Sequence, residues 1–419
     1  MTHALDLIFR DATLPGRAGT VDIGLQSGRI AAIEPRLDAD APEIALDGRL
    51  AIAGFVDSHI HLDKACLLGR CGHAHGGEYG EPGLTGLAGA IRAVSAMKRS
   101  FTVEDVYARG ARVLDRAIVK GTTRMRTHVE VDPRVGLRGF EAVRALKRDY
   151  AWALDLSICV FPQEGLTNDP GAEELLVAAL EGGADVLGGC PYTDAAPRDQ
   201  IARIFALAER FDVDLDFHLD FDLDPSWNHL DEVCRRTEQH RYHGRVAVGH
   251  VTKLSACAPD ALARILQRLL ECGIAVTTLP ATDLYLMGRD VTHNVPRGVT
   301  PVHRLASQGL ACSIATNNVL NPFTPFGDAS LLRMANLYAN VAHVEPDAFD
   351  LCFDLVTAGA ARLMNLADYG IAPGHPGDVV VLDAKSPAAA LAEIAEPVLG
   401  FKNGRRTFAR APARIFRPG

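Results

Sequence analysis

Short apolar runs alternate with amphipathic stretches through the middle of the chain. The amphipathic stretches repeat apolar residues at every third or fourth position, the spacing of a helix that packs on a core. Strands that alternate with such helices are typical of βα units joined into a parallel sheet. We expect strands over 55–62, 122–131, 152–162, 184–192, 214–220, 246–251, 273–281 and 309–317, and helices over 103–119, 173–182, 198–210, 260–271 and 328–341.

Eight strands of this kind predict an α/β fold, the closed (β/α)8 barrel of the TIM type. The two ends of the chain differ from the middle, with short alternating strands separated by Gly, Asp and Pro turns. An Asn-Gly pair at 403–404 marks a hairpin turn near the C-terminus. We therefore predict a barrel over 56–370, flanked by a small β-sandwich that residues 1–55 and 371–419 form together.

Composition narrows the class of protein. The 419 residues are 48% hydrophobic and 23% charged, an ordinary mixture for a globular chain. The formal net charge is −9 and no basic run occurs, so we expect no nucleic-acid partner. The nine cysteines form no CxxC pair, which suits a reducing cytoplasm. No segment has the roughly 18 apolar residues that span a bilayer, so we expect a cytoplasmic protein without a membrane partner.

Histidines gather at one end of the predicted barrel. His59 and His61 end the first strand, and His128, His218 and His250 lie at the ends of the second, fifth and sixth strands. Barrel enzymes place their chemistry at the carboxyl ends of their strands. A lone histidine is more often a hydrogen-bonded core residue, but five of them on one rim predict a functional site.

The His-x-His pair at the first strand end indicates a metal site. Alternation along a strand points His59 and His61 to the same side, where both imidazoles can reach one ion. His218 and His250 come from other strands and could add a third ligand and an imidazole that orients water or polarises a substrate. A histidine site with an open position activates water at neutral pH.

Six segments of the sequence resemble blocks of the cytosine-deaminase-like amidohydrolases, in the same order along nearly the whole chain. They are GFVDSHIHLDK at 54–64, RTHVEVD at 126–132, FPQEG at 161–165, FHLD at 217–220, GHVTKLSA at 249–256 and TNNVLNPFTPFGD at 316–328. The resemblance implies a barrel with a flanking β-sandwich and one divalent metal ion, zinc or iron. It also implies hydrolytic removal of an amine from a nitrogen heterocycle, in a homo-oligomeric protein.

The resemblance also assigns roles to individual residues. His250 would bind or polarise the attacking water and the substrate. The HLDK segment is more similar to the N-isopropylammelide hydrolase branch than to cytosine deaminase itself, which makes Lys64 a substrate-side residue. The expected metal ligands are His59, His61 and His218, and the expected substrate contacts are Lys64, His128, Gln163 and Asn318.

Two positions depart from the pattern of the family. Phe221 stands where cytosine deaminase has a Glu that shuttles protons, and Asn317 stands where the family has an Asp that ligates the metal and accepts a proton. A neutral amide can coordinate a metal weakly, but it cannot act as a base near neutral pH. His250 is the simplest replacement base, and Asn317 remains at the catalytic position as a neutral ligand. The carboxylates that could serve instead are Asp222, Asp220 and Glu164.

These observations predict metal-dependent hydrolysis of a C–N bond in a small cyclic, nitrogen-rich compound such as a pyrimidine or s-triazine. The reaction would release ammonia or an alkylamine, or open a ring. The alternative, motivated by Phe221 and Asn317, is a weak or inactive homologue that binds a heterocycle or metal. A second pair, His73 and His75, lies in a Gly-rich segment that indicates a loop, and we assign it no metal.

Overall fold

The computed structural model describes residues 5–70, 86–411 and 413–417, so His73 and His75 lie outside the described residues. Eight parallel strands form one sheet in the order β13-β12-β11-β10-β9-β8-β7-β6, which confirms the predicted barrel. The strands are β6 (Phe55–Ile60), β7 (Thr122–Glu130), β8 (Asp155–Phe161), β9 (Val186–Leu187), β10 (Asp214–Leu219), β11 (Val246–His250), β12 (Ile274–Thr278) and β13 (Cys312–Ile314).

The first and last strands of the barrel approach each other at Asn317. Its backbone N–H donates to the carbonyl oxygen of His59 at 2.8 Å, and its carbonyl oxygen accepts from the N–H of His61 at 2.9 Å. A parallel bridge joins Asn317 to Ile60, between the two histidines. The barrel therefore closes at the His-x-His pair.

The fourth strand is much shorter than the sequence predicts. We expected a strand over 184–192, but β9 covers only Val186 and Leu187. Gly188 lies so close to the neighbouring strand that a Cβ there would come within 2.7 Å of the carbonyl oxygen of Asp216. The chain then turns into a short 3-10 helix that begins at Pro191, which has no N–H for a ladder.

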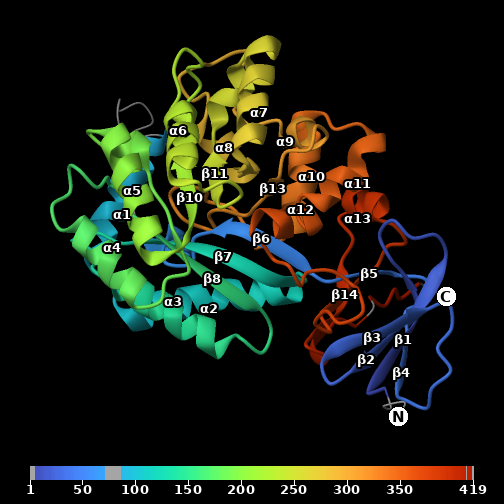
Figure 1. The fold of residues 1–419 in the computed structure, drawn as a ribbon. Coiled ribbons are helices and arrows are strands. Elements are labelled where there is room, and N and C mark those ends of the chain that lie inside the picture. Colours follow the sequence, from blue (N-terminus) through green and yellow to red (C-terminus); the bar gives the residue numbers. More distant parts are fainter. Residues whose placement is uncertain (1–4, 71–85, 412, 418–419) are drawn as a thin grey trace.

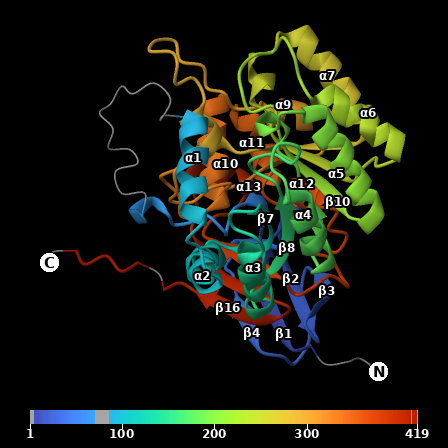
Figure 2. The same cartoon turned by 90° about the vertical axis from the view of Figure 1, so that its left-hand side faces the viewer.

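Helices cover the outside of the barrel (Figures 1 and 2). The five helices predicted from periodicity are present, with ends within three residues of the prediction. Thr102 caps α2 by accepting from the N–H of Asp105, and Ser330 caps α10 by accepting from the N–H of Arg333. The helices are α1 (Gly86–Lys98), α2 (Val103–Val119), α3 (Arg138–Asp149), α4 (Ala172–Glu181), α5 (Pro197–Phe211), α6 (Leu230–His240), α7 (Pro259–Cys272), α8 (Pro280–Leu286), α9 (Val302–Ala306), α10 (Leu331–Ala342), α11 (Phe349–Asp354), α12 (Ala358–Leu363) and α13 (Pro387–Glu393).

The two ends of the chain share a second sheet beside the barrel, as predicted. In Figure 1 the blue N-terminal strands and the red β14 lie together. The rings of Phe9 and Phe401 meet edge to face at 5.0 Å although their strands are not neighbours, so the sheet folds over its own apolar core. Its strands are β1 (Leu7–Thr13), β2 (Thr20–Gln26), β3 (Arg29–Glu34), β4 (Glu43–Ala45), β5 (Leu50–Ile52), β14 (Val379–Leu382), β15 (Pro397–Lys402) and β16 (Arg405–Ala409).

Among the described residues, no helix has both the length and the apolar character that crossing a membrane requires. The main apolar core lies between the barrel strands and the surrounding helices. The limits of the predicted domains, 1–55, 56–370 and 371–419, remain a prediction. The carboxyl ends of the barrel strands carry the polar residues described next.

Candidate metal centre and active site

Three buried imidazoles converge at the carboxyl ends of β6 and β10. The Nε2 of His218 lies 3.1 Å from the Nε2 of His59 and 3.2 Å from the Nε2 of His61. The Nδ1 of His61 lies 3.0 Å from the carbonyl oxygen of His128 and donates to it when it carries the proton. With the proton on Nδ1, the Nε2 of His61 is unprotonated, and its lone pair is directed at the other two rings.

The environment keeps these three imidazoles neutral. Burial lowers the pKa of His59, His61 and His218 well below the ordinary value, and the neighbouring histidines lower it further. Neutral imidazole is the form of histidine that binds metals. The cluster is therefore in the ligand state at neutral pH.

The residues of the cluster fit a divalent ion. In a tetrahedral site with bonds of about 2.0 Å, ligand nitrogens lie roughly 3.3 Å apart, which is near the separations of the Nε2 atoms. The buried Oδ1 of Asn317 has no hydrogen-bond partner among the described residues. His59, His61 and His218 would hold such an ion, with Asn317 as a further candidate ligand, and the ion would supply a Lewis acid to the cavity.

A fourth imidazole, His250, lies beside the cluster at the end of β11. Its Nδ1 is 2.6 Å from Oδ1 of Asp283 on α8, and the other carboxylate oxygen of Asp283 accepts from the N–H of Leu279. The backbone of His250 is in the left-handed region, with φ 70°, and Phe221 stacks on its ring at 3.9 Å between centroids. Sequence reasoning missed Asp283, although it comes soon after the seventh strand, where a carboxylate could have been noticed.

Lys64 and Gln163 form the polar side of the site. The Nζ of Lys64 donates to Oε1 of Glu130 at 2.6 Å and to Oε1 of Gln163 at 3.2 Å. The other oxygen of Glu130 accepts from Lys98 at 2.8 Å. Burial raises the pKa of Glu130, but the two ammonium groups more than offset this effect and lower it overall. Glu130 is therefore a charged bridge between Lys64 in the site and Lys98 on α1.

A second group of acidic residues is already paired with a cation. Glu130, Asp132 and Glu164 lie close enough to hold a metal, but the Nζ of Lys98 lies within hydrogen-bond distance of all three. Glu164 also pairs with Arg134 at 3.0 Å. The structure therefore places Glu164, one of the carboxylates considered as a base, in a buried ion-pair network.

Other predicted residues lie away from the open side of the histidines. His128 stacks on His59 at 3.6 Å and its Nε2 lies 3.4 Å from Asp216, so it sits behind the cluster. Asp222 pairs with Lys253 at 3.1 Å and accepts from the N–H of Asp224. Neither His128 nor Asp222 lines the cavity at the histidines.

The cavity at the histidines encloses about 10 Å³, which is room for a single water molecule. It brings together most of the predicted residues, and it adds aromatic and hydroxyl groups that sequence reasoning missed. The lining residues are His61, Lys64, Gln163, Tyr192, His218, Phe221, His250, Thr282, Asn317, Asn318 and Phe323.

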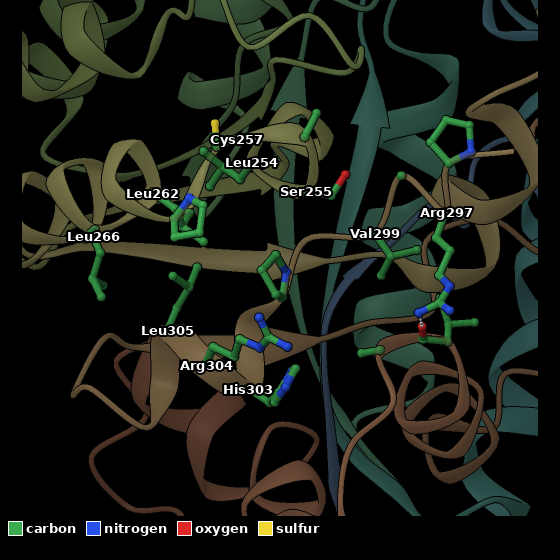
Figure 3. A pocket seen from close by; sticks show the side chains of 18 of the residues that line it. Leu254, Ser255, Cys257, Leu262, Leu266, Arg297, Val299, His303, Arg304 and Leu305 are labelled. Carbon is green, nitrogen blue, oxygen red and sulfur yellow. Dashed lines mark hydrogen bonds between the residues drawn. The ribbon is translucent and has the colours of Figure 1, made fainter. Parts of the chain in front are cut away.

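A separate groove lies on the outside of the barrel, between α7 and α9 (Figure 3). Its volume is about 640 Å³, and leucines such as Leu262, Leu266 and Leu305 line it. Arg297 at its edge donates to the carbonyl oxygen of Val341 at 2.6 Å. None of the clustered histidines lines this groove, so we do not assign the chemistry to it.

The fold and the site define a (β/α)8-barrel protein with a histidine cluster suited to a divalent metal. The sequence profile of the Amidohydrolase family matches residues 84–408, and the chain belongs to this family. It is accordingly a hydrolase that acts on carbon–nitrogen bonds other than peptide bonds, as the resemblance implied.

Three known proteins show how far the similarity extends. N-isopropylammelide isopropyl amidohydrolase of Pseudomonas sp. (strain ADP) is 26% identical over 413 residues, which cover 97% of this chain and 98% of that protein. Pterin deaminase of Rhizobium rhizogenes is 27% identical over 372 residues, 87% of this chain and 82% of that protein. The structure of 5-methylcytosine deaminase from Klebsiella pneumoniae with 5-fluorocytosine superposes with a TM-score of 0.92 at 29% identity, covering 98% of this chain and 99% of that one.

Proposed function

We propose that the protein hydrolyses a C–N bond in a small nitrogen heterocycle, with one divalent ion, zinc or iron, held by His59, His61 and His218. The convergence of the three Nε2 atoms beside the unpartnered Oδ1 of Asn317 carries this proposal. The bond that breaks joins the ring to an amino or alkylamino group, or is the C–N bond of a cyclic amide. A cytoplasmic homo-oligomer remains our prediction for the state of the protein in the cell.

The residues around the cluster supply the proton transfers. A bound ion would activate a water molecule as a Lewis acid, bringing the pKa of that water towards neutrality. Asp283 accepts from Nδ1 of His250, which leaves Nε2 of His250 to take a proton from the attacking water. The water oxygen bonds to the ring carbon as this proton leaves it, and the same nitrogen then returns the proton to the leaving amine as the C–N bond breaks. His250 thus serves in place of the carboxylates that Phe221 and Asn317 do not provide.

The polar side of the cavity would hold the heterocycle. An ammonium group has three N–H donors, and Lys64 uses two of them on Glu130 and Gln163. The third is left for an oxygen or a ring nitrogen of the substrate. Asn318 also lines the cavity, and its Oδ1 accepts a hydrogen bond from Asn321 at 2.7 Å. Its amide N–H groups would therefore also donate to the substrate.

The relatives support a heterocyclic substrate. Their names refer to an alkylamino-triazine derivative, a pterin and a methylated cytosine. All three names describe enzymes, so the alternative of an inactive homologue gains no support from these relatives.

Metal analysis and a substrate panel test the proposed function. The protein would be purified with zinc and with iron, and its metal content measured beside the release of ammonia and alkylamines. The panel contains cytosines, pterins, alkylamino-triazines and cyclic amides. We expect about one ion per chain and turnover in at least one class. Metal-replete protein that turns over none of these classes would contradict the proposal.

A further inference from the structure

The imidazole of His250 reaches the cluster from a strand position that should point it the other way. In the pairing of β10 with β11, Gly249 lies opposite His218, and His250 lies opposite Leu219. A Cβ on Gly249 would come within 3.2 Å of the His59 ring, so position 249 faces the interior of the barrel. Because successive residues of a strand point to opposite faces, a regular strand would direct His250 outward, where Leu219 packs in the main apolar core.

A turn in the backbone brings the ring to the cluster instead. His250 has φ 70° and Val251 has φ 41°, so two consecutive residues lie in the left-handed region. The ring centroids of His250 and His218 are 5.6 Å apart, although their strand positions face opposite sides of the sheet. The left-handed turn is therefore what brings the proposed base to the cluster.

This backbone conformation needs support from the rest of the fold. A left-handed φ is uncommon for any residue other than glycine, and it is a genuine outlier for a β-branched residue such as Val251. Such conformations persist only where the surrounding structure holds them, and they gather at active sites. The N–H of Val251 donates to the carbonyl oxygen of Leu219 at 3.0 Å, which fixes one side of the turn. The other side is held by a residue from a later part of the chain.

The hydroxyl of Thr300 holds the carbonyl side of the turn. Its Oγ1 lies 2.8 Å from the carbonyl oxygen of His250 and 3.0 Å from that of Val251, so its single proton can be donated to either. Thr300 is fully buried, and the nearby Val299 and Val302 pack in the main apolar core. The hydroxyl is therefore presented to the turn from a part of the chain that the core fixes in place.

We infer that Thr300 is a positioning residue for His250, because its hydroxyl holds the left-handed turn that directs the imidazole to the cluster. Thr300 and Asp283 both belong to the connection between β12 and β13, and one contacts the backbone of His250 while the other contacts its ring. Thr300 does not line the cavity at the histidines, so it acts only through His250. The inference rests on the proposed function, in which His250 transfers the proton.

Variants of Thr300 separate the hydroxyl from the bulk of the side chain. Thr300→Val keeps the shape and removes the donor, whereas Thr300→Ser keeps the donor. Misplacing a group by about 1 Å can cost about 100-fold in rate, so Thr300→Val should lower kcat by about 10–100-fold, with a smaller change in KM. Thr300→Ser should have a kcat close to that of the native protein. If Thr300→Val does not fold, Thr300→Ala, which also lacks the hydroxyl, takes its place.

Thr237→Val is the matched control for the loss of a buried hydroxyl. The hydroxyl of Thr237 is also buried, and it donates to the carbonyl oxygen of Val233 at 2.9 Å within α6. Its removal should leave kcat unchanged, because this hydrogen bond lies away from His250. Kinetics would be measured on the substrate class that the panel identifies. A loss of kcat in Thr237→Val as large as in Thr300→Val would overturn the inference.

Val251→Gly tests whether the hydroxyl acts by holding the turn. Glycine adopts a left-handed φ without strain, so the turn should then depend less on Thr300. The fold-loss in kcat caused by Thr300→Val should therefore be smaller in the Val251→Gly background than in the native protein. Equal losses in the two backgrounds, or a Thr300→Ser variant as impaired as Thr300→Val, would overturn the inference.

Crystal structures of the zinc-loaded native protein and of Thr300→Val test the turn without any turnover. In the variant we expect His250 or Val251 to leave the left-handed region, and Nδ1 of His250 to move out of hydrogen-bond distance of Asp283. An unchanged turn and ring in Thr300→Val would overturn the inference whatever its activity. A displaced ring in the variant, when the native protein hydrolyses nothing in the panel, would uphold the positioning role and contradict the proposed function instead.

Discussion

The carboxylate of Asp283 lies 2.6 Å from Nδ1 of His250, with both groups buried at the carboxyl ends of the barrel strands. A carboxylate in this position fixes the tautomer of the imidazole and stabilises its protonated form. Burial raises the pKa of Asp283, while the hydrogen bond to His250 opposes that rise. In the proposed function this pair would supply a base that acts through an imidazole, in a site where Asn317 and Phe221 supply none.

The Asp283→Asn variant tests this pair. An amide in place of the carboxylate can donate to Nδ1 of His250 and so favour the wrong tautomer. We expect kcat to fall by about 10²–10⁴-fold, the usual contribution of general-base catalysis, with little change in metal content or melting temperature. Steady-state kinetics beside metal analysis would measure both effects.

Asp222→Asn is the matched control, because Asp222 is one of the carboxylates that the sequence offered as an alternative base. In the structure it pairs with Lys253 and does not reach the cavity. We expect its replacement to leave kcat nearly unchanged, because the side chain lies outside the cavity that holds the proposed reacting groups. If Asp222→Asn is severely impaired while Asp283→Asn is active, the base is Asp222 and our assignment is wrong.

Metal binding should depend on the His-x-His pair. His61→Ala removes one of three converging nitrogens and should abolish stoichiometric metal. Added zinc should raise the melting temperature of the native protein, because a ligand that binds only the folded state stabilises it, and this rise should be absent in the variant. His240→Ala, on α6 and outside the cluster, is the control. Native-like metal content in folded His61→Ala would rule out His61 as a required ligand.

The amide of Gln163 should contribute to substrate binding. Its Oε1 accepts from Lys64, and the residue lines the cavity. Losing a hydrogen bond to a charged group costs about 1.5–3 kcal/mol, so Gln163→Ala should lower kcat/KM by about 10–100-fold on a true substrate. Gln267→Ala, on the exposed face of α7, is the control. An unaltered kcat/KM for Gln163→Ala would exclude a transition-state contact by this side chain.

The sequence was sufficient for the fold and for the histidines because both follow from local periodicity. Strand alternation directs His59 and His61 to one side, and the rule that barrels react at strand ends selects His218 and His250. It was insufficient for Asp283, because whether a side chain on α8 meets His250 depends on how the helix packs. The same limit applies to His128, whose strand-end position did not reveal that its ring faces Asp216 behind the cluster.

Asn317 is the residue on which the proposed function depends. Its backbone joins His59 and His61 across the closing seam of the barrel, at φ 61°, a left-handed conformation that Asn adopts more readily than most residues. Its Oδ1 is buried without a partner among the described residues. The side chain is therefore held at the cluster by the backbone, and Asn317→Asp changes the charge of the site with little change in its shape.

The effect of Asn317→Asp distinguishes an adapted hydrolase from a decayed deaminase. An anionic oxygen is a better ligand than an amide for a hard or borderline cation, so the variant should bind zinc more tightly if the site has merely lost its carboxylate. In that case it should also regain part of the general-base contribution on cytosine-type substrates. We expect the opposite, because in the proposed function His250 and Asp283 form the base, and a second carboxylate would compete with them for the proton. If the native protein is active and Asn317→Asp is less active, the result would support an adapted mechanism. A large gain in cytosine deamination by Asn317→Asp would overturn that interpretation.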